Sequence, residues 1–378
     1  MLLHLFKWMV DHHWASQDGM FGVIIFRAAL AILFAFVLVL AGGGRVIRWL
    51  MKQKVGDMPE FYNKDLNELT KNKKNTPTMG GLLIIGAILV TVLLFADIMN
   101  FYVRMAMFCM IYLACLGAVD DWLKLTAGRR TPGSREGLYA YEKLLFQVGL
   151  GVLLAIFIYY HGNSAPALDG SAPSAHKLNW PFFRDLTLPP SLFAILTVIV
   201  ITGSSNAVNL TDGMDGLAGG CMAIVAFAFL CLAYATGVEQ IANQVHFHWV
   251  PRTGELSVVC GAITGACLGF LWFNCNPAQV FMGDTGSLAL GGVVGYIAIV
   301  VRQEPMLLLV GGIFVLEATS VMMQVSYFRM TGGKRIFLCS PIHHHFHLKG
   351  WSEQQVVVRF WLISALCAAF GLATVKLR

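Results

Sequence analysis

Acidic side chains recur at three points where long apolar runs of this chain are interrupted. Asp120 and Asp121 are adjacent, Asp212 and Asp215 are three residues apart, and Asp284 stands among glycines and hydroxyl residues. Ionisable groups at membrane depth are costly, so they commonly mark a functional site. Carboxylates surrounded by hydroxyl and amide oxygens favour a hard cation such as Mg²⁺ over zinc. The three turns therefore predict a magnesium site that handles phosphate.

The spacing of the acids suggests separate roles. Two adjacent carboxylates repel each other, which raises one pKa and makes either Asp120 or Asp121 a candidate base. Asp212 and Asp215 would share one face of a helix. Thr211 or Asp212 could cap the helix that follows, whose N-terminus would then bind an anionic phosphate.

Basic, aromatic and histidine residues add to this picture. The turn that follows Pro341 carries His343, His344, His345 and His347, without the partners of a zinc site. Phosphate binding or proton transfer is the better interpretation. Phe281 could stack on a base or simply lie at a membrane interface, and the lysines before Thr76 could hold phosphate or anchor the chain in the cytoplasm.

Composition assigns the chain to the membrane proteins. Of its 378 residues 57% are hydrophobic and only 13% charged, with a net charge of +6. A soluble domain carries roughly a quarter of its residues as charges. Spans of about 20 apolar residues are predicted at ten places: Phe21–Gly44, Gly80–Ile98, Phe101–Val119, Leu144–Tyr160, Ser191–Val208, Gly213–Thr236, Leu256–Phe273, Gly286–Val301, Met306–Phe328 and Val356–Val375.

The predicted fold class is all-α, a single polytopic domain over residues 1–378 with a short interfacial segment at 1–20. Most loop lysines and arginines lie in the odd-numbered loops, near 45–79, 120–143 and 329–355. The positive-inside rule places these loops in the cytoplasm and both termini outside. The short turns near 209–215 and 274–285 then face the cytoplasm as well, so every acidic turn lies on one side.

These motifs together resemble those of the bacterial phospho-N-acetylmuramoyl-pentapeptide transferases, a branch of the polyprenyl-phosphate N-acetylhexosamine-1-phosphate transferases. The resemblance extends over almost the whole chain. It is carried by the segments Thr76–Gly81, Asp120–Asp121, Asn206–Asp215, Phe270–Asn274, Pro277–Asp284 and Pro341–His345. The Pro-Ile-His-His-His segment is specific to the muramoyl branch, and the family often has an acidic residue at the position of His347.

The resemblance implies a homodimer in the bacterial inner membrane with a cytoplasm-facing cleft, and no nucleic-acid partner. UDP-N-acetylmuramoyl-pentapeptide and undecaprenyl phosphate would give lipid I and UMP, with Mg²⁺ as cofactor and Asp284 as its ligand. The implied catalytic residues are Asp120, Asp121, Asp284 and His343. The implied substrate-binding residues are Lys73, Thr78, Lys143, Asn209, Asp212, Asp215, Asn274, Phe281, Gln324, His344 and His345.

Two other functions fit parts of the sequence. An N-acetylglucosamine-1-phosphate transferase would use the same lipid and the same acidic motifs, but the histidine turn argues against it. A secondary transporter would place its ionisable groups near mid-span, where this chain has only Glu317 and Gln324. Release of UMP from a UDP-sugar and a lipid phosphate would separate a transferase from a transporter. Direct attack and a covalent aspartyl intermediate both remain open at this stage.

Overall fold

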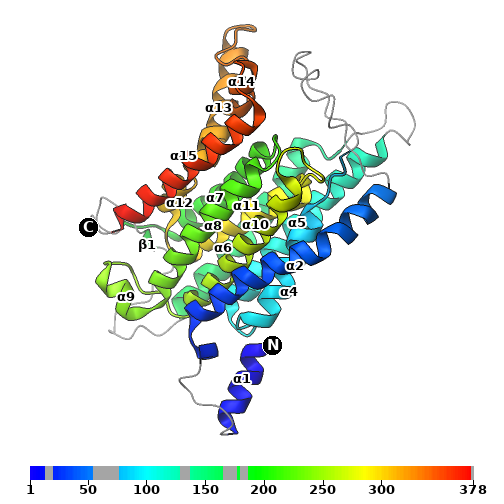
Figure 1. The fold of residues 1–378 in the computed structure, drawn as a ribbon. Helices are drawn as coiled ribbons and strands as arrows, with labels where there is room; N and C mark the ends of the chain where they lie inside the picture. Colours follow the sequence, from blue (N-terminus) through cyan, green and yellow to red (C-terminus); the bar gives the residue numbers. More distant parts are fainter. Residues whose placement is uncertain (13–19, 54–75, 128–136, 165–176, 179–185, 376–378) are drawn as a thin grey trace.

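The chain folds into a bundle of helices with one two-stranded hairpin, β1 (Lys177–Leu178) paired antiparallel with β2 (Leu186–Thr187) (Figure 1). The structure, a computed structural model, describes residues 1–12, 20–53, 76–127, 137–164, 177–178 and 186–375. The helices are α1 (Leu2–Asp11), η1 (Met20–Gly22), α2 (Ile24–Lys52), α4 (Gly81–Phe95), α5 (Phe101–Ala127), α6 (Ala140–Ser164), α7 (Pro190–Thr211), α8 (Leu217–Gly237), α9 (Glu239–Gln244), η3 (Thr253–Glu255), α10 (Leu256–Asn274), α11 (Gly283–Val300), α12 (Glu304–Val310), α13 (Gly312–Met330), α14 (Ile342–Leu348) and α15 (Glu353–Thr374).

The predicted all-α polytopic class is confirmed. Within the described residues, eight helices are long and apolar enough to cross a membrane, and the bent pair α12–α13 would make a ninth. Helix α4 is also apolar but has only 15 residues, fewer than the roughly 20 that a perpendicular span needs. Each of the ten predicted ranges coincides with a helix or with the bent pair, so the count of ten holds approximately.

Helix α11 lies in the middle of the bundle and is buried along its whole length. It packs against α5 and α7, while α10 packs against α2 and α8 (Figure 1). The outer helices α2, α6 and α15 expose large apolar side chains such as Leu33, Leu145 and Leu366. A protein in water with this much exposed apolar surface would tend to aggregate, but such a surface is expected where a protein contacts lipid.

Small residues set the closest helix contacts, as in α10. A Cβ atom placed on Gly265 would lie 2.0 Å from the backbone oxygen of Ile32 in α2. Such small-residue faces let helix backbones approach each other in a membrane, where packing rather than hydrophobic burial drives association.

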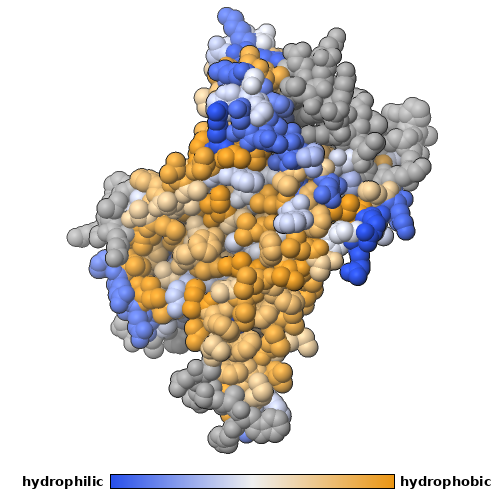
Figure 2. All heavy atoms as spheres, in the orientation of Figure 1, coloured by the Kyte–Doolittle hydropathy of each residue, from blue (hydrophilic) through white to orange (hydrophobic). Residues whose placement is uncertain are grey.

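The chain departs from a plain bundle at Gly311, where α12 and α13 meet at an angle of 85°. Because of this bend, α13 and α14 project from one end of the bundle together with the start of α15 (Figure 1). Figure 2 shows a broad apolar surface over the body of the molecule, with hydrophilic atoms gathered on this projection and near the C-terminal end of α2. The hydropathy pattern predicted one span at Met306–Phe328, and the structure divides this range between two helices that meet at the bend.

Two local predictions are wrong. Helix α5 does not end at Asp120 but continues to Ala127, and Lys124 pairs with Asp120 one turn earlier. Helix α8 begins only at Leu217, so Asp212 follows the end of α7 and does not cap α8. The residue before α8 is Gly216, with a φ of 80° that suits glycine. The N-terminal helix predicted within residues 1–20 is present as α1.

Glycine is required where α4 meets α11. A Cβ atom on Gly81 would lie 2.2 Å from the backbone nitrogen of Gly286, whereas one on Gly86, in the same helix, meets nothing within 4 Å. Gly81→Ala should therefore destabilise the protein by about 1–3 kcal/mol through overpacking. Gly86→Ala should be neutral or stabilising by up to about 1 kcal/mol.

Thermal unfolding of both purified variants in one detergent measures the difference. Equal unfolding temperatures for the two variants would contradict the close packing of α4 on α11.

Candidate active site

The start of α11 is held by a carboxylate from another helix. Asp121 of α5 accepts hydrogen bonds from the backbone N–H groups of Asp284 and Thr285 at 3.1 and 3.0 Å, and from the Thr285 hydroxyl at 2.6 Å. The first amides of a helix have no partner within the helix, and a negative charge there is stabilising. Both oxygens of Asp121 are engaged in this way, so Asp121 fixes the position of its neighbour Asp284.

Four charged side chains from three helices meet beside this junction. Lys124 lies 2.8 Å from Asp120 and 3.1 Å from Asp284, and Lys143 of α6 lies 2.5 Å from Asp120 and 2.8 Å from Asp284. Both carboxylates are almost fully buried. Two acids and two lysines balance in charge, which makes their burial tolerable. We call Asp120, Asp284, Lys124 and Lys143 the charged cluster.

The turn after α7 borders the charged cluster. Asn209 donates a hydrogen bond of 2.7 Å to Asp284 and one of 2.9 Å to the Ser287 hydroxyl. Three residues later, desolvation and the negative charges of Asp284 and Asp121 raise the pKa of Asp212 to about 8. A cation bound beside these carboxylates would lower that pKa. The structure therefore brings the acids of the three predicted turns close enough for Asp121 and Asp284 to act on Asp212.

The donor set fits a magnesium ion that is shared with a phosphate ligand. Among the described residues, no three His, Cys, Asp or Glu side chains converge to form a metal site on their own. Mg²⁺ usually binds through one or two carboxylates and completes its shell with water and substrate phosphates. Asp284 and Asp120 supply that number of carboxylates. The buried Asp120 Oδ2 contacts both ammonium groups, and Oδ1 of the same carboxylate accepts the Leu138 N–H at 2.7 Å.

Asp215 and Asn274, predicted to bind substrate, are engaged in holding two turns together. Asp215 accepts hydrogen bonds from the Asn276 side chain at 3.0 Å and from the Ala278 N–H at 3.1 Å, and its own N–H donates to Glu353. Asn274 accepts from the Gly216 N–H and donates to the Val280 oxygen. Both side chains are buried. Their contacts position the turn that leads from Asn276 to Asp284.

The segment around Thr78 pairs with the residues that precede α11. Phe281 donates its N–H to the Pro77 oxygen, and its own oxygen accepts the Gly80 N–H, both at 2.8 Å. Thr78 is buried against Gly283. Phe281 is half-buried at this junction. The predicted Lys73 lies outside the described residues.

The histidine turn lies on the other side of Asp212. A Cβ atom on Gly213 would come within 2.5 Å of His343 Nε2 and 3.4 Å of His344 Nε2. His345 accepts a hydrogen bond from the Leu338 N–H at its Nδ1, and burial and Lys349 lower its pKa. Gln324 accepts hydrogen bonds from the backbone of the same loop, at the Ile336 and Phe337 N–H groups. Gln324 therefore holds the loop that leads into α14, the helix that carries the histidines.

Sequence reasoning assigned no site role to Lys124, Glu317 or Glu353. The signal for Lys124 was its position four residues after Asp120 on one helix face. Glu317 and Glu353 are far in sequence from their partners His343 and Asp215, so no spacing rule could have found them.

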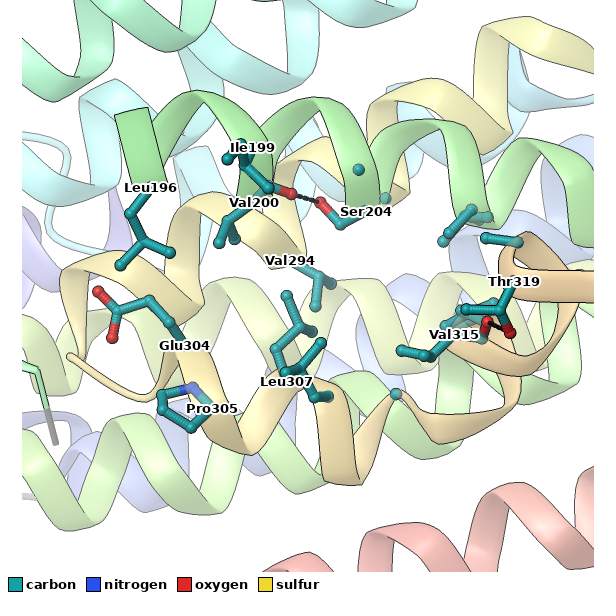
Figure 3. Close-up of a pocket in the computed structure, with 18 of the residues that line it drawn as sticks. Leu196, Ile199, Val200, Ser204, Val294, Glu304, Pro305, Leu307, Val315 and Thr319 are labelled. Carbon is teal, nitrogen blue, oxygen red and sulfur yellow. Dashed lines mark hydrogen bonds between the residues drawn. The ribbon is translucent and has the colours of Figure 1, made fainter. Parts of the chain in front are cut away.

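An apolar cavity lies between α7, α11, α12 and α13, with a volume of about 320 Å³. Figure 3 shows Leu196 and Glu304 at one end and Val315 and Thr319 at the other. Its lining includes Val208, the residue directly before Asn209. The cavity therefore reaches the last two turns of α7, the helix that also carries Asn209.

Comparisons with known proteins agree with this site. Residues 103–302 match the family Glycosyl transferase family 4, and residues 73–85 match the first phospho-N-acetylmuramoyl-pentapeptide-transferase signature. The chain is 45% identical over 363 residues to a phospho-N-acetylmuramoyl-pentapeptide-transferase of Desulfotalea psychrophila, covering 95% of this chain and 96% of that protein. A relative of the same description from Rickettsia montanensis is 42% identical over 376 residues, covering 99% of this chain and all of that protein.

The chain is thus a polytopic membrane transferase of the glycosyl transferase family 4 class. Within that class it belongs to the phospho-N-acetylmuramoyl-pentapeptide-transferase family.

The contacts of Asp215 predict a structural role that can be measured. Asp215→Ala would remove two part-buried hydrogen bonds to a carboxylate, from the Ala278 N–H and the Asn276 side chain, at a cost of about 1–3 kcal/mol. We expect a lower unfolding temperature in detergent, together with reduced activity. An unchanged unfolding temperature combined with weaker nucleotide binding would instead show that Asp215 contacts the substrate.

Proposed function

We propose that this chain transfers phospho-N-acetylmuramoyl-pentapeptide from its UDP-activated form to undecaprenyl phosphate, giving lipid I and UMP. The observation that carries the proposal is the charged cluster, two buried carboxylates sharing two lysines, in a chain 45% identical to a transferase of that name. Relatives with this description disfavour the N-acetylglucosamine alternative. A secondary transporter would have its acidic site near the middle of its spans. In this chain Asp120 and Asp121 lie in the last turns of α5, and Asp284 lies in the first turn of α11.

The chemistry brings two anions together. An oxygen of the lipid phosphate attacks the β-phosphorus of the nucleotide sugar, and the bond from that phosphorus to the bridging oxygen breaks. UMP leaves with the bridging oxygen. Lys124 and Lys143 are placed to stabilise the charge on these phosphates, since positioning and electrostatics supply most of the catalysis in phosphoryl transfer. A Mg²⁺ ion bound through Asp284 and Asp120 would neutralise further charge on the diphosphate.

The two adjacent aspartates have different tasks in this proposal. Asp121 has both oxygens engaged by the start of α11, so its role is to hold that helix. Oxygen Oδ2 of Asp120 contacts the Lys124 and Lys143 ammonium groups rather than a helix terminus. A lysine that turns to the incoming phosphate would free this oxygen to take the proton of the lipid phosphate as a base, and Asp120 rather than Asp121 is our candidate for that role.

The nucleotide would lie across the turns that surround Asp284. Phe281 offers a partly exposed ring at the junction of two turns, and base stacking on such a ring is worth about 1–3 kcal/mol. Thr78, Asp212 and the histidine turn border the same region, and Lys73 stays a substrate-binding residue by family resemblance alone. Asp215, Asn274 and Gln324 would act by holding these turns in place.

The lipid would reach the site from the bilayer. The cavity between α7, α11, α12 and α13 has an apolar lining that suits a prenyl chain (Figure 3). The lining includes Ala207 and Val208 near the end of α7, so a chain held there would extend toward the end of α7 that carries Asn209. The positive-inside pattern supports an active site that faces the cytoplasm, with both termini outside the inner membrane. A homodimer completes the proposal by family resemblance.

Asp284→Asn should remove activity while the protein stays folded, because the variant loses the carboxylate best placed for the cation. We expect UMP release to fall by about 100-fold or more, since metal stabilisation of a phosphoryl transition state is worth several kcal/mol. UMP release measured across a magnesium titration, with the unfolding temperature as the folding control, tests this expectation. Near-normal turnover at low magnesium would remove Asp284 from the metal site.

Direct attack also predicts what happens without the lipid. Enzyme mixed with the UDP-substrate alone should release no UMP, and no aspartate should carry a phospho-sugar. Mass spectrometry of Asp120, Asp121 and Asp284 after quenching is the measurement. Stoichiometric UMP release together with an adduct on one of these residues would establish the covalent route instead.

A further inference from the structure

A second buried pair, Glu317 and His343, joins α13 to the helix α14 that carries the histidines. Glu317 is in α13 and is 0% exposed, as is His343 of α14. Oxygen Oε2 of Glu317 lies 3.1 Å from His343 Nδ1. The other oxygen of Glu317 has no hydrogen-bond partner among the described residues. A carboxylate enclosed in apolar surroundings is costly, and the imidazole is the group that offsets this cost.

The contact fixes how the imidazole is presented. An acceptor at Nδ1 requires that nitrogen to carry the hydrogen, which leaves Nε2 to face the other way. Nε2 has no hydrogen-bond partner within the described part of the chain, and it lies against Gly213. Gly213 directly follows Asp212 in the turn that borders the charged cluster. The unpartnered nitrogen is therefore directed at the turn where the diphosphate would bind.

We propose that Glu317 is a positioning residue for the transfer reaction. It holds His343 by Nδ1, so that Nε2 is presented to a diphosphate oxygen of the nucleotide substrate, to which it donates a hydrogen bond when this nitrogen carries a proton. Carboxylates that orient a functional histidine in this way are a general device, and their loss commonly reduces activity by about 10–100-fold in metal sites. The inference rests on the proposed function, because the diphosphate is the substrate named there.

A positioning role for Glu317 and a purely structural role in α13 predict different behaviour of double variants. If Glu317 acts through His343, its charge matters only while the imidazole is present. Contacting residues that act as a unit give non-additive effects in a double-mutant cycle. A purely structural role would instead appear as lost stability, whatever residue stands at position 343.

The experiment measures UMP release from UDP-N-acetylmuramoyl-pentapeptide and undecaprenyl phosphate by full-length protein in detergent. We expect Glu317→Gln to lower kcat about 10–100-fold with little change in the nucleotide KM, because Gln keeps the shape but not the charge. Glu317→Asp, which keeps the charge, should retain more of the turnover. In a His343→Ala background, Glu317→Gln should have almost no further effect.

Ser320→Ala is the matched control. Ser320 is also buried in α13, but its hydroxyl bonds only to the Glu317 backbone oxygen within its own helix. Its turnover should equal that of the unmodified protein. Additive effects of Glu317→Gln and His343→Ala, or wild-type turnover of Glu317→Gln, would overturn the positioning role. Absence of UMP release from the unmodified protein would overturn the proposed function itself, and the positioning role with it.

Discussion

The site depends on the contact between Asp121 and the first turn of α11. That carboxylate satisfies two backbone amides and one hydroxyl of a helix that is otherwise enclosed by α4, α5 and α7. Without an acceptor, those buried amides would each cost a hydrogen bond in surroundings that exclude water. The same contact sets where Asp284 points. One side chain, Asp121, thus supplies the acceptor that the start of α11 needs and also positions the acid Asp284.

Charge balance explains why so many ionisable groups can lie at the end of the bundle. Asp120 and Asp284 would repel each other if alone, and Lys124 and Lys143 each contact both of them. A phosphate ligand adds further negative charge. The two lysine ammonium groups would then have to contact the phosphate and the carboxylates at the same time. An additional cation restores the balance. The charges of the site therefore support the divalent metal of the proposed function, which family membership also favours.

The sequence predicted those features that follow from periodicity and solvent preference. Apolar runs of the right length located every major helix, and costly polar residues within them located the turns. Features that depend on distant contacts were not predictable. Helix α5 continues past Asp120 because its charged residues find partners on α6 and α11, and α13 turns away from α12 although both are apolar.

The role of each individual acid could not be predicted from the sequence either. Asp215 and Asp284 look alike in sequence, each an acid in a glycine-rich turn. In the structure Asp215 is engaged by Asn276 and Ala278, whereas Asp284 meets lysines and Asn209. Only the partners distinguish a residue that holds a turn from one that faces a ligand, and partners are set by the tertiary fold.

The bend at Gly311 joins the two halves of the proposed reaction. A straight α12–α13 span would continue across the bundle as one rod. With an angle of 85° at the bend, α12 and α13 each supply residues to the apolar cavity, and α13 also carries Glu317 out to the histidine turn. One bent element thus borders both the apolar space suited to a lipid and the polar turn suited to a nucleotide. A reaction between a membrane substrate and a water-soluble one requires this arrangement, because neither substrate can leave its own solvent at low cost.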